Sequence, residues 1–270
     1  MTKIAIIAGD GNLPIYIGNT LLNKNYDVTF LSLNSKNNKF FFNHKIIDIN
    51  IISIKKILNV LDSNKIKNII FAGSIKRPSI KDIGFDVQTF LLAKNLLLEK
   101  KGDNNLLVSI KKYFESKGYN FFNWTKYCKE LFSTELNLTN IKPSKIANLN
   151  LLKAKSVYQI YKKLDIGQAM IVQNQLVLGL EAIEGTDELI KRCSHYKRKG
   201  DNGILLKFTK KNQSNLIDIP VIGLDTIIKL KKYNYEGVFL QKNKCLVLDK
   251  DKIIDYANKN KLFISSLELN

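Results

Sequence analysis

Hydrophobic runs of two kinds alternate along the first part of the chain. Residues 4–8 form a continuous apolar run that stops at Gly9, which is typical of a parallel strand covered on both faces. Similar strands are predicted at 26–33 and 68–72, and apolar residues at helical spacing predict a helix at 51–61 between them. Strands that alternate with helices indicate a right-handed, doubly wound sheet.

The α/β pattern continues to the end of the chain. Periodicity is lost around Pro143, which indicates a linker at 133–149 between a first domain at 1–132 and a second at 150–270. The remaining elements are predicted as helices at 87–99, 106–116, 151–164, 187–199 and 252–260, and strands at 119–122, 169–172, 176–181, 204–208, 237–240 and 243–248. Residues 173–175 would turn a β-hairpin.

The charge balance changes the choice of partners. Lys and Arg number 43 against 24 Asp and Glu, which leaves a net charge of +19 that attracts nucleotides, nucleic acids or acidic membrane surfaces. Ile, Asn, Lys and Leu dominate the whole chain, so part of the lysine excess follows from its general composition. No nucleic-acid motif accompanies the charge, and we expect no nucleic-acid partner.

Cysteines and the N-terminal residues indicate the compartment. Cys128, Cys193 and Cys245 lie far apart, so the sequence predicts neither a disulfide framework nor a zinc site. The first residues lack the apolar core of a signal peptide, and no stretch approaches about 18 uncharged apolar residues. We expect a cytoplasmic protein that can touch the inner membrane from its cytoplasmic face.

The first candidate for chemistry follows the first strand. Gly9, Gly11 and Asn12 stand where a nucleotide-binding fold places its phosphate loop, between a strand and a helix. Glycines let the backbone approach a phosphate, and the helix N-terminus offers N–H donors. Pro14 replaces the third glycine of the dinucleotide fingerprint, and no acidic residue ends the second strand at 31–34, which disfavours an NAD-dependent enzyme. The alternative is a tight turn that needs glycine for its conformation alone.

The second candidate is the loop after the strand at 68–72. Gly73 is followed by Lys76 and Arg77, a mobile cation and a planar phosphate fork. Ligands of open α/β sheets bind beyond the carboxyl ends of the strands, so this loop should face the same crevice as the first one. The alternative is a solvated pair of surface cations. Asp103 could contact phosphate or cap the helix that follows it.

The third candidate is acidic and lies in the second domain. Carboxylates from separate segments suit a hard cation such as Mg²⁺, which takes one or two of them together with substrate phosphates. Alternatively, Thr186 and Asp187 cap a helix and Asp218 satisfies a turn. Asp218 lies in an apolar stretch, where a buried charge is costly without a partner. The acidic residues in question are Asp165, Glu181, Glu184, Asp187, Glu188 and Asp218.

Six stretches together resemble the LpxI-type UDP-2,3-diacylglucosamine pyrophosphatases of lipid A biosynthesis. Each stretch is a weak signal, but six in one order over nearly the whole chain are specific. They read Ile-Ala-Gly-x-Gly-x-Leu-Pro at 7–14, Phe-Ala-Gly-x-Ile-x-Arg-Pro at 71–78, Lys-Gly-Asp-Asn-x-Leu-Leu at 101–107, Leu-Asp-Ile-Gly-Gln at 164–168, Glu-Ala-Ile-Glu-Gly-Thr-Asp at 181–187 and Asp-Ile-Pro-x-Ile-Gly at 218–223.

The resemblance implies a fold and a reaction. The fold is a Rossmann-like N-terminal domain joined by a linker to a distinct mixed α/β C-terminal domain. The reaction is the Mg²⁺-dependent hydrolysis of UDP-2,3-diacylglucosamine to UMP and 2,3-diacylglucosamine 1-phosphate (lipid X). By the same comparison, Asp218 is the catalytic, metal-associated carboxylate, with Asp187 and Gln168 as catalytic neighbours, Glu184 as a metal ligand and Thr186 on the phosphates.

The sequence also leaves a non-catalytic function open and suggests how the chain could bind lipid and a second copy of itself. The chain could instead be a non-catalytic nucleotide-binding or membrane-docking protein, in which case the loss of Asp218 would leave its function intact. A diacyl substrate needs an apolar sleeve, for which the hairpin residues 170–172 and 176–180 are candidates, although they could equally be ordinary core. A homodimer is expected on general grounds.

Overall fold

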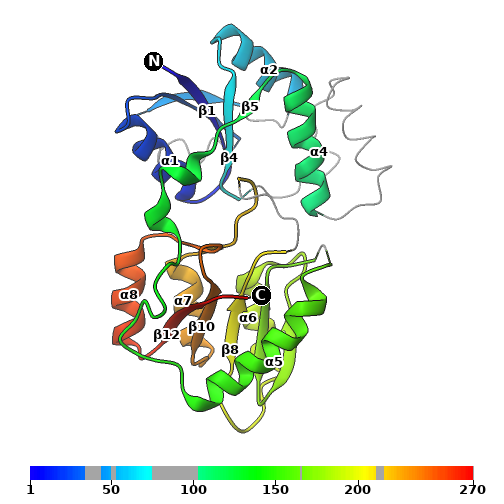
Figure 1. The fold of residues 1–270 in the computed structure, drawn as a ribbon, viewed down its shortest axis with the longest axis vertical. Helices are drawn as coiled ribbons and strands as arrows, with labels where there is room; N and C mark the ends of the chain where they lie inside the picture. The colour runs from blue at the N-terminus through cyan, green and yellow to red at the C-terminus, as the bar shows by residue number, and fades with distance from the viewer. Residues whose placement is uncertain (34–43, 50–52, 75–102, 165, 211–215, 270) are drawn as a thin grey trace. The chain divides into compact units, whose positions relative to one another are not determined.

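The computed structural model describes residues 1–33, 44–49, 53–74, 103–164, 166–210 and 216–269 (Figure 1). The side chains of residues 103–107 also lie outside this description. Two compact units form, one from residues 1–129 with 214–218 and the other from 130–213 with 219–270. The helix expected at 87–99 lies outside the described residues, as do Lys76 and Arg77.

A parallel sheet forms the centre of the first unit. Its order is β3-β2-β1-β4-β5, and every pair in it is parallel. Residues 4–8 of the central strand are at most 2% exposed, which confirms the prediction of a strand covered on both faces. The strands are β1 (Lys3–Ala8), β2 (Asp27–Ser32), β3 (Lys45–Asp48), β4 (Asn68–Ala72) and β5 (Asn120–Phe121).

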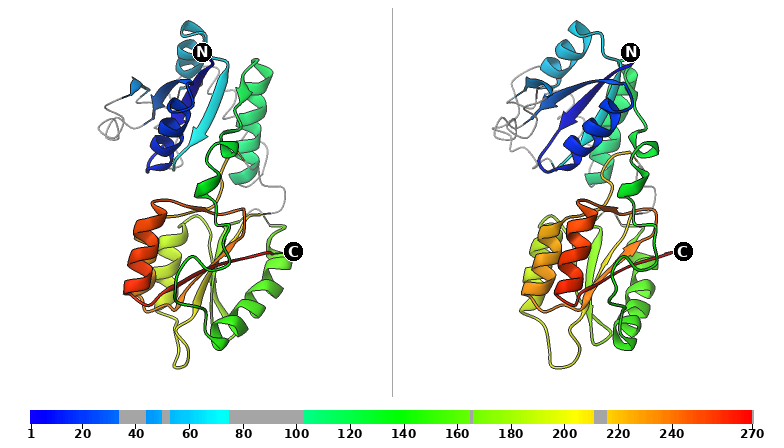
Figure 2. Two further views of the ribbon diagram at one scale, coloured as in Figure 1. Left: turned by 60° about the vertical axis from the view of Figure 1, so that its left-hand side comes forward. Right: turned by 90° about the vertical axis from the view of Figure 1, so that its left-hand side faces the viewer.

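Helices cover both faces of this sheet. On one face, Ala5 and Ile7 of β1 pack with apolar residues of α2 (Ile54–Ser63) and with Phe114 of α4 (Asp103–Ser116). On the other side lies α1 (Leu13–Leu22), which packs against β2 (Figure 2). The helices predicted at 51–61 and 106–116 are thereby confirmed. Two short 3₁₀ helices, η2 (Trp124–Lys126) and η3 (Lys129–Leu131), follow the last strand.

The second unit contains a mixed sheet. Strands β8, β10 and β12 are parallel, whereas β6 is antiparallel to both β8 and β7, in the order β12-β10-β8-β6-β7. The hairpin predicted around residues 173–175 is confirmed as β6 and β7. The strands are β6 (Ala169–Gln173), β7 (Leu176–Leu180), β8 (Ile204–Lys207), β10 (Gly237–Gln241) and β12 (Phe263–Leu267), beside a small parallel pair of β9 (Val221–Ile222) and β11 (Leu246–Val247).

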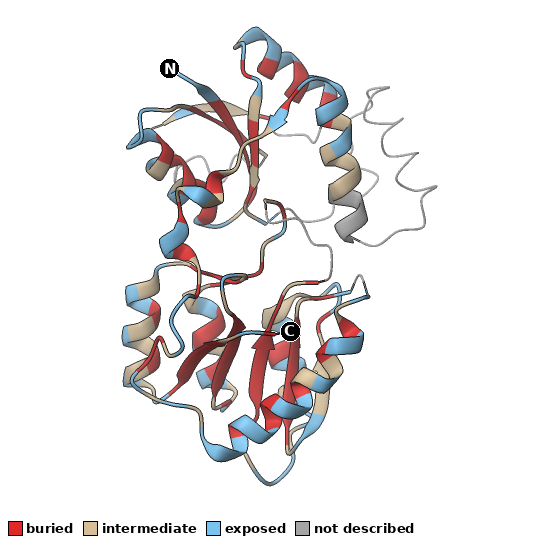
Figure 3. Cartoon of the chain, viewed as in Figure 1, coloured by how far each residue is buried: buried red, intermediate tan, exposed pale blue. Residues whose placement is uncertain are grey.

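Alternate residues of each central strand enter different cores. Ala169 and Ile171 belong to the core under α6 (Thr186–Ser194), α7 (Leu224–Lys232) and α8 (Lys250–Lys259). Met170 and Val172 belong to the core under α5 (Lys145–Tyr161), on the opposite face of the sheet (Figures 2 and 3). Residues 170–172 are fully buried, so the proposed lipid sleeve is wrong for this part of the hairpin.

Some elements differ from the sequence-based expectation. Helix α5 begins at Lys145, inside the stretch expected as linker, because the Ser144 hydroxyl accepts the Ala147 N–H at 3.0 Å and caps the helix. The same stretch pairs with β12, where Ser266 N–H donates to Leu136 O at 2.8 Å. Helix α6 ends at Ser194, earlier than the 199 expected.

The end of the chain also differs from the expectation, because it contains a strand that was not predicted. The prediction closed it with the helix at 252–260, but β12 follows α8 and pairs with β10. Two serines, Ser265 and Ser266, interrupt the apolar run of β12 and weaken its pattern, although both are buried. Helix α7 was not predicted either. None of the helices in the described part of the chain is long and apolar enough to cross a membrane.

The loops after β1 and β4 are bonded to each other. Asp10 N–H donates to Ser74 O at 2.7 Å, and Ser74 N–H donates to Asp10 O at 2.8 Å. Gly73, which directly precedes Ser74, has a φ of +88°, and a Cβ at this position would approach Asp10 O to 2.7 Å. The left-handed conformation and the close approach both require glycine at this position.

Replacing Gly73 with alanine tests this junction. We expect Gly73→Ala to lower the free energy of unfolding by about 2–4 kcal/mol, because it combines a strained φ with a backbone clash. Gly118→Ala is the matched control, since Gly118 has a φ of +82° but open space around a Cβ, and it should cost only about 1 kcal/mol. Urea unfolding measures both, and equal losses would show that the loop contact adds nothing.

Candidate functional site

The two glycine loops of the first unit meet at the carboxyl ends of neighbouring strands. Gly9 and Gly11 follow β1, and Asn12 precedes α1, whose first turn contains Pro14. Gly73 follows β4, which pairs with β1, and the backbone bonds between the loops confirm that they lie together. Their binding of phosphate stays a prediction. Asp103 begins α4, but its side chain is outside the described residues.

A second group of polar side chains lies at one edge of the second sheet. Lys207 ends β8 and pairs in register with Ala169, the first residue of β6. Gln168 precedes that residue, and its carbonyl accepts Phe208 N–H at 3.0 Å. Glu181 directly follows β7, the hairpin partner of β6. The carboxyl end of β8 therefore lies beside the start of β6 and the end of β7, which is where α/β sheets place ligands.

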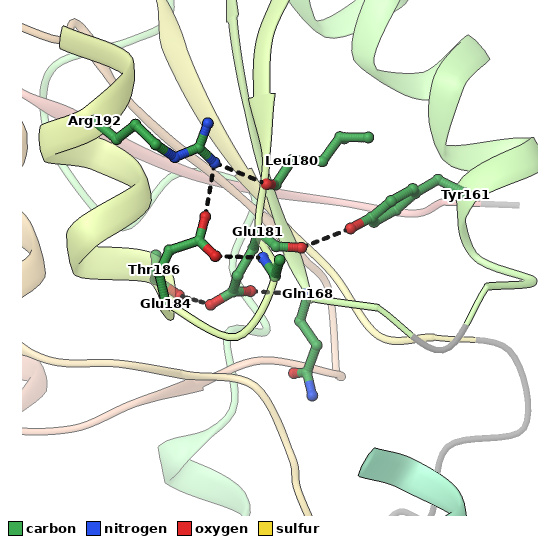
Figure 4. A network of polar contacts seen from close by, with 8 residues as sticks. Tyr161, Gln168, Leu180, Glu181, Glu184, Thr186 and Arg192 are labelled. Atoms are coloured by element: carbon green, nitrogen blue, oxygen red, sulfur yellow. Dashed lines mark hydrogen bonds and ion pairs between the residues drawn. The ribbon is translucent and has the colours of Figure 1, made fainter. Parts of the chain in front are cut away.

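The carboxylate of Glu181 is buried at the centre of this edge (Figure 4). Its Oε2 accepts Gln168 N–H at 2.6 Å, and its Oε1 accepts the Thr186 hydroxyl at 2.7 Å. Its main-chain carbonyl accepts the Tyr161 hydroxyl at 2.8 Å and Gly167 N–H at 3.0 Å. Four segments of the chain are thus joined at one residue, and the buried charge has the donors that it requires.

The network ends at a buried lysine. Lys207 is 6% exposed, and its Nζ donates to Thr186 Oγ1 at 2.5 Å. Glu181 therefore orients Thr186, and Thr186 in turn holds Lys207. Lys207 falls in the strand predicted at 204–208 but was not among the candidate residues. The available signal was a charged residue between the apolar residues Leu206 and Phe208 of a buried strand.

Gln168 and Glu184 lie close to the network without joining their side chains to Glu181. In Figure 4 the Gln168 side chain extends away from the Glu181 carboxylate. Glu184 Oε1 accepts Arg192 Nη2 at 2.7 Å, and its Oε2 accepts Ala182 N–H at 3.1 Å. Partial burial alone would raise the pKa of Glu184, but the hydrogen bond and charge of Arg192, together with hydrogen bonds from backbone N–H groups, lower that pKa overall.

Asp187 connects helix α6 to helix α7 through hydrogen bonds. Its Oδ1 accepts the Thr226 hydroxyl at 2.8 Å, and its Oδ2 accepts Lys229 Nζ at 2.6 Å. Both partners belong to α7, so the carboxylate bridges α6 to α7. The hydrogen bond from Lys229 to Asp187 raises the pKa of the lysine. A catalytic role for Asp187 stays a prediction, and in this arrangement both of its carboxylate oxygens already accept hydrogen bonds from side chains of α7.

Asp218 differs from the other acidic candidates. It is exposed and has a φ of +61°, a left-handed conformation that is uncommon outside glycine but enriched for Asp. Backbone strain of this kind often marks functional positions. Asp218 ends the segment 214–218 that belongs to the first unit, and the next residue belongs to the second.

The described side chains differ in how well they suit Mg²⁺. Within residues that the structure describes, no three His, Cys, Asp or Glu side chains gather to hold a metal ion. Mg²⁺ usually takes only one or two carboxylates and completes its shell with water and substrate phosphates, and the exposed Asp218 fits that requirement. Glu184 fits it only if its ion pair with Arg192 opens.

The free energy of unfolding tests the hydrogen bond from the Thr186 hydroxyl to Glu181. Thr186→Val removes the hydroxyl that satisfies the buried Glu181 carboxylate, and we expect it to lower the free energy of unfolding by about 1–3 kcal/mol. Thr186→Ser keeps the hydroxyl and should stay within about 0.5 kcal/mol of the wild type. Chemical denaturation of the two variants provides the comparison, and equal losses would contradict the role assigned to the hydroxyl.

Comparison with known proteins covers both halves of the chain. The model of the LpxI N-terminal domain matches residues 3–131, and the model of the LpxI C-terminal domain matches residues 134–265. The UDP-2,3-diacylglucosamine pyrophosphatase LpxI of Caulobacter vibrioides is 26% identical over 275 aligned residues, covering 99% of this chain and 98% of that protein. With both domains matched in order over nearly its full length, the chain belongs to the LpxI family.

Proposed function

We propose that this protein hydrolyses the pyrophosphate bond of UDP-2,3-diacylglucosamine, giving UMP and 2,3-diacylglucosamine 1-phosphate for lipid A biosynthesis, with Mg²⁺ as cofactor. The observation that carries the proposal is the match of both halves to the LpxI family, together with the nearly full-length similarity to the Caulobacter pyrophosphatase. The substrate class and reaction follow from that relative's name.

A Rossmann-like nucleotide role for the first unit is part of this proposal. Its parallel order β3-β2-β1-β4-β5 corresponds to the first five strands of doubly wound nucleotide-binding sheets. Its glycine loops stand at the carboxyl ends of β1 and β4, beside the N-terminus of α1. We assign the nucleotide phosphates to Gly9, Gly11, Asn12 and Gly73, with Lys76, Arg77 and Asp103 as further contacts.

The chemistry requires charge neutralisation and a positioned water molecule. Mg²⁺, when bound, neutralises charge on the phosphate oxygens of the substrate. Asp218 would hold it with an exposed carboxylate. The second unit contributes Gln168 near the network and a buried cation, Lys207, at the carboxyl end of β8. A phosphoanhydride can be hydrolysed by direct attack of water, so the proposal assigns no covalent nucleophile.

The central test is UMP release from UDP-2,3-diacylglucosamine with and without Mg²⁺. We expect Asp218→Ala to lower the metal-dependent rate by about 100-fold or more, as for the loss of one electrostatic group at a reacting centre. Asp251→Ala is the matched control, because Asp251 is an exposed carboxylate in the first turn of α8, and it should retain the wild-type rate.

The other outcomes of this assay are equally informative. Release that survives Asp218→Ala would contradict the assignment of Asp218 and move the metal to Asp187 and Glu184. No release by the folded wild-type protein would contradict the pyrophosphatase itself and favour a non-catalytic nucleotide-binding protein. A homodimer stays an expectation, which analytical ultracentrifugation would measure.

Peripheral membrane contact is the second part of the proposal, and α5 is the surface that favours it. The inner side of α5 packs on the sheet through Leu151 and Tyr158. Its outer side exposes large apolar residues, including Leu152 at 63% and Ile160 at 72%. The exposed set comprises the apolar Ile146, Leu149, Leu152 and Ile160 and the basic Lys145 and Lys153, followed by Lys163 just beyond the end of the helix.

Charge distinguishes this surface from the other helices of the second unit. Residues 145–164 contain five lysines and no acidic residue, whereas α6, α7 and α8 each have an acidic residue in the first turn. Exposed apolar side chains among lysines suit the interface of an anionic lipid bilayer. A second copy of the same positive surface would be repelled, so lipid is the occupant that we propose.

Vesicle sedimentation tests the α5 surface. We expect binding to vesicles that contain phosphatidylglycerol and weak binding to phosphatidylcholine alone. The double variant Leu152→Asn, Ile160→Asn should weaken the binding about tenfold or more, because both apolar side chains lose their burial. Ile183→Asn is the control, since Ile183 is 81% exposed but lies outside α5. Equal binding by the double variant and the control would contradict this surface.

A further inference from the structure

Lys207 is a buried cation that pairs directly with no carboxylate in the described part of the chain. Its side chain is 6% exposed, and the Thr186 hydroxyl accepts one of its three N–H groups. In the part of the chain that the structure describes, no carboxylate oxygen lies within 4.0 Å of its Nζ. The closest acidic neighbour in the network, Glu181, already accepts from Thr186 and Gln168 with its two carboxylate oxygens.

Such an arrangement works against the stability of the folded protein. A buried charge is expensive unless an opposite charge and hydrogen bonds compensate for the water that it loses. One hydroxyl compensates the ammonium of Lys207 only in part. An anionic ligand that enters from outside would bring a negative charge into direct contact with the ammonium and accept its remaining N–H groups.

The space beside Lys207 suits an anion. Thr186 is the first residue of α6, so the N-terminus of this helix and its partly positive dipole end lie at the same place. Gly185 precedes it with a φ of +79°, and the position that a Cβ would take there is open space. The first N–H groups of a helix have no partner within the helix and are available to a ligand.

Two acidic residues in the same helical turn are already compensated. Asp187 accepts from Thr226 and Lys229 of α7. Glu188 forms an ion pair with Lys191 at 3.7 Å along α6. Neither carboxylate pairs with Lys207, and Glu181 already accepts hydrogen bonds from Thr186 and Gln168, so the ammonium of Lys207 is the donor that an anion would meet here.

We propose that Lys207, held in place by Thr186, binds a phosphoryl oxygen of the substrate, with the N-terminal N–H groups of α6 as further donors. The proposal rests on the proposed function, which supplies a pyrophosphate as the ligand, and it names the group of the second unit that receives it. Lys207 is then a substrate-binding residue. Thr186 and Glu181 are positioning residues, because they act on the phosphate through Lys207.

Phosphate titration followed by ¹H–¹⁵N NMR tests the site directly. The probe is inorganic phosphate, added to the full-length protein at constant ionic strength. In the wild type, the amide signals of Gly185, Thr186 and Asp187 should move and saturate. In Lys207→Met the apparent affinity should fall about tenfold or more, because a charge-assisted hydrogen bond is lost. Lys191→Met is the matched control on the exposed side of α6 and should bind as the wild type does.

Thermal unfolding without phosphate separates a binding role from a structural one. If Lys207 binds a ligand, replacing its incompletely compensated buried charge with methionine should leave the melting temperature unchanged or raise it, and phosphate should no longer raise it further. Lys207→Gln, which keeps a donor for Thr186 without the charge, should behave in the same way. Loss of folding in both variants would show that the ammonium supports the fold and would overturn the proposal.

The remaining outcomes separate this site from the reaction. Signals that move linearly without saturation, or that saturate equally in Lys207→Met, would overturn the assignment of Lys207. Saturable, Lys207-dependent phosphate binding in a protein that releases no UMP from UDP-2,3-diacylglucosamine would preserve the anion site and overturn the pyrophosphatase. The hydrolysis assay and the phosphate titration therefore fail independently.

Discussion

The buried carboxylate of Glu181 is the constraint on which the second unit's polar edge depends. One residue receives hydrogen bonds from the end of α5, the start of β6 and the first residue of α6. A charge in that position is tolerable only while all of its donors stay in place. The network therefore fixes the relative positions of three elements, and through Thr186 it also fixes where the ammonium of Lys207 stands.

In both units the candidate anion site lies at the carboxyl ends of parallel strands, but the groups that form it differ. In the first, the carboxyl ends of parallel strands present glycine loops that are joined by paired backbone bonds. In the second, the carboxyl end of a parallel strand meets the start of an antiparallel one, and buried charges take the place of glycines. A loop of backbone N–H groups and a buried lysine are two physical solutions to anion recognition.

The acidic residues that stand out in this basic sequence serve different purposes. Glu181 organises the network, Glu184 pairs with Arg192, and Asp187 bridges to α7. Their positions at the ends of separate predicted strands and helices suggested a common metal site, but each of these three carboxylates meets a different cation or donor. Asp218 is exposed and has a left-handed backbone conformation. Spacing alone cannot distinguish these outcomes, because partners such as Lys229 lie far away along the chain.

The α/β class, most strands, the glycine loops and the family could be predicted from the residues alone, because hydrophobic period and short motifs are local properties. Tertiary structure decided the rest. Strand β12 escaped prediction because two serines interrupt its apolar run, and only the fold buries them and gives the Ser265 hydroxyl its acceptor, Leu136 O. The role proposed for Lys207 depends on its burial beside Thr186, which the sequence does not show. Lysine is common in this chain, but an ammonium group that loses its water on folding favours the binding of an anion.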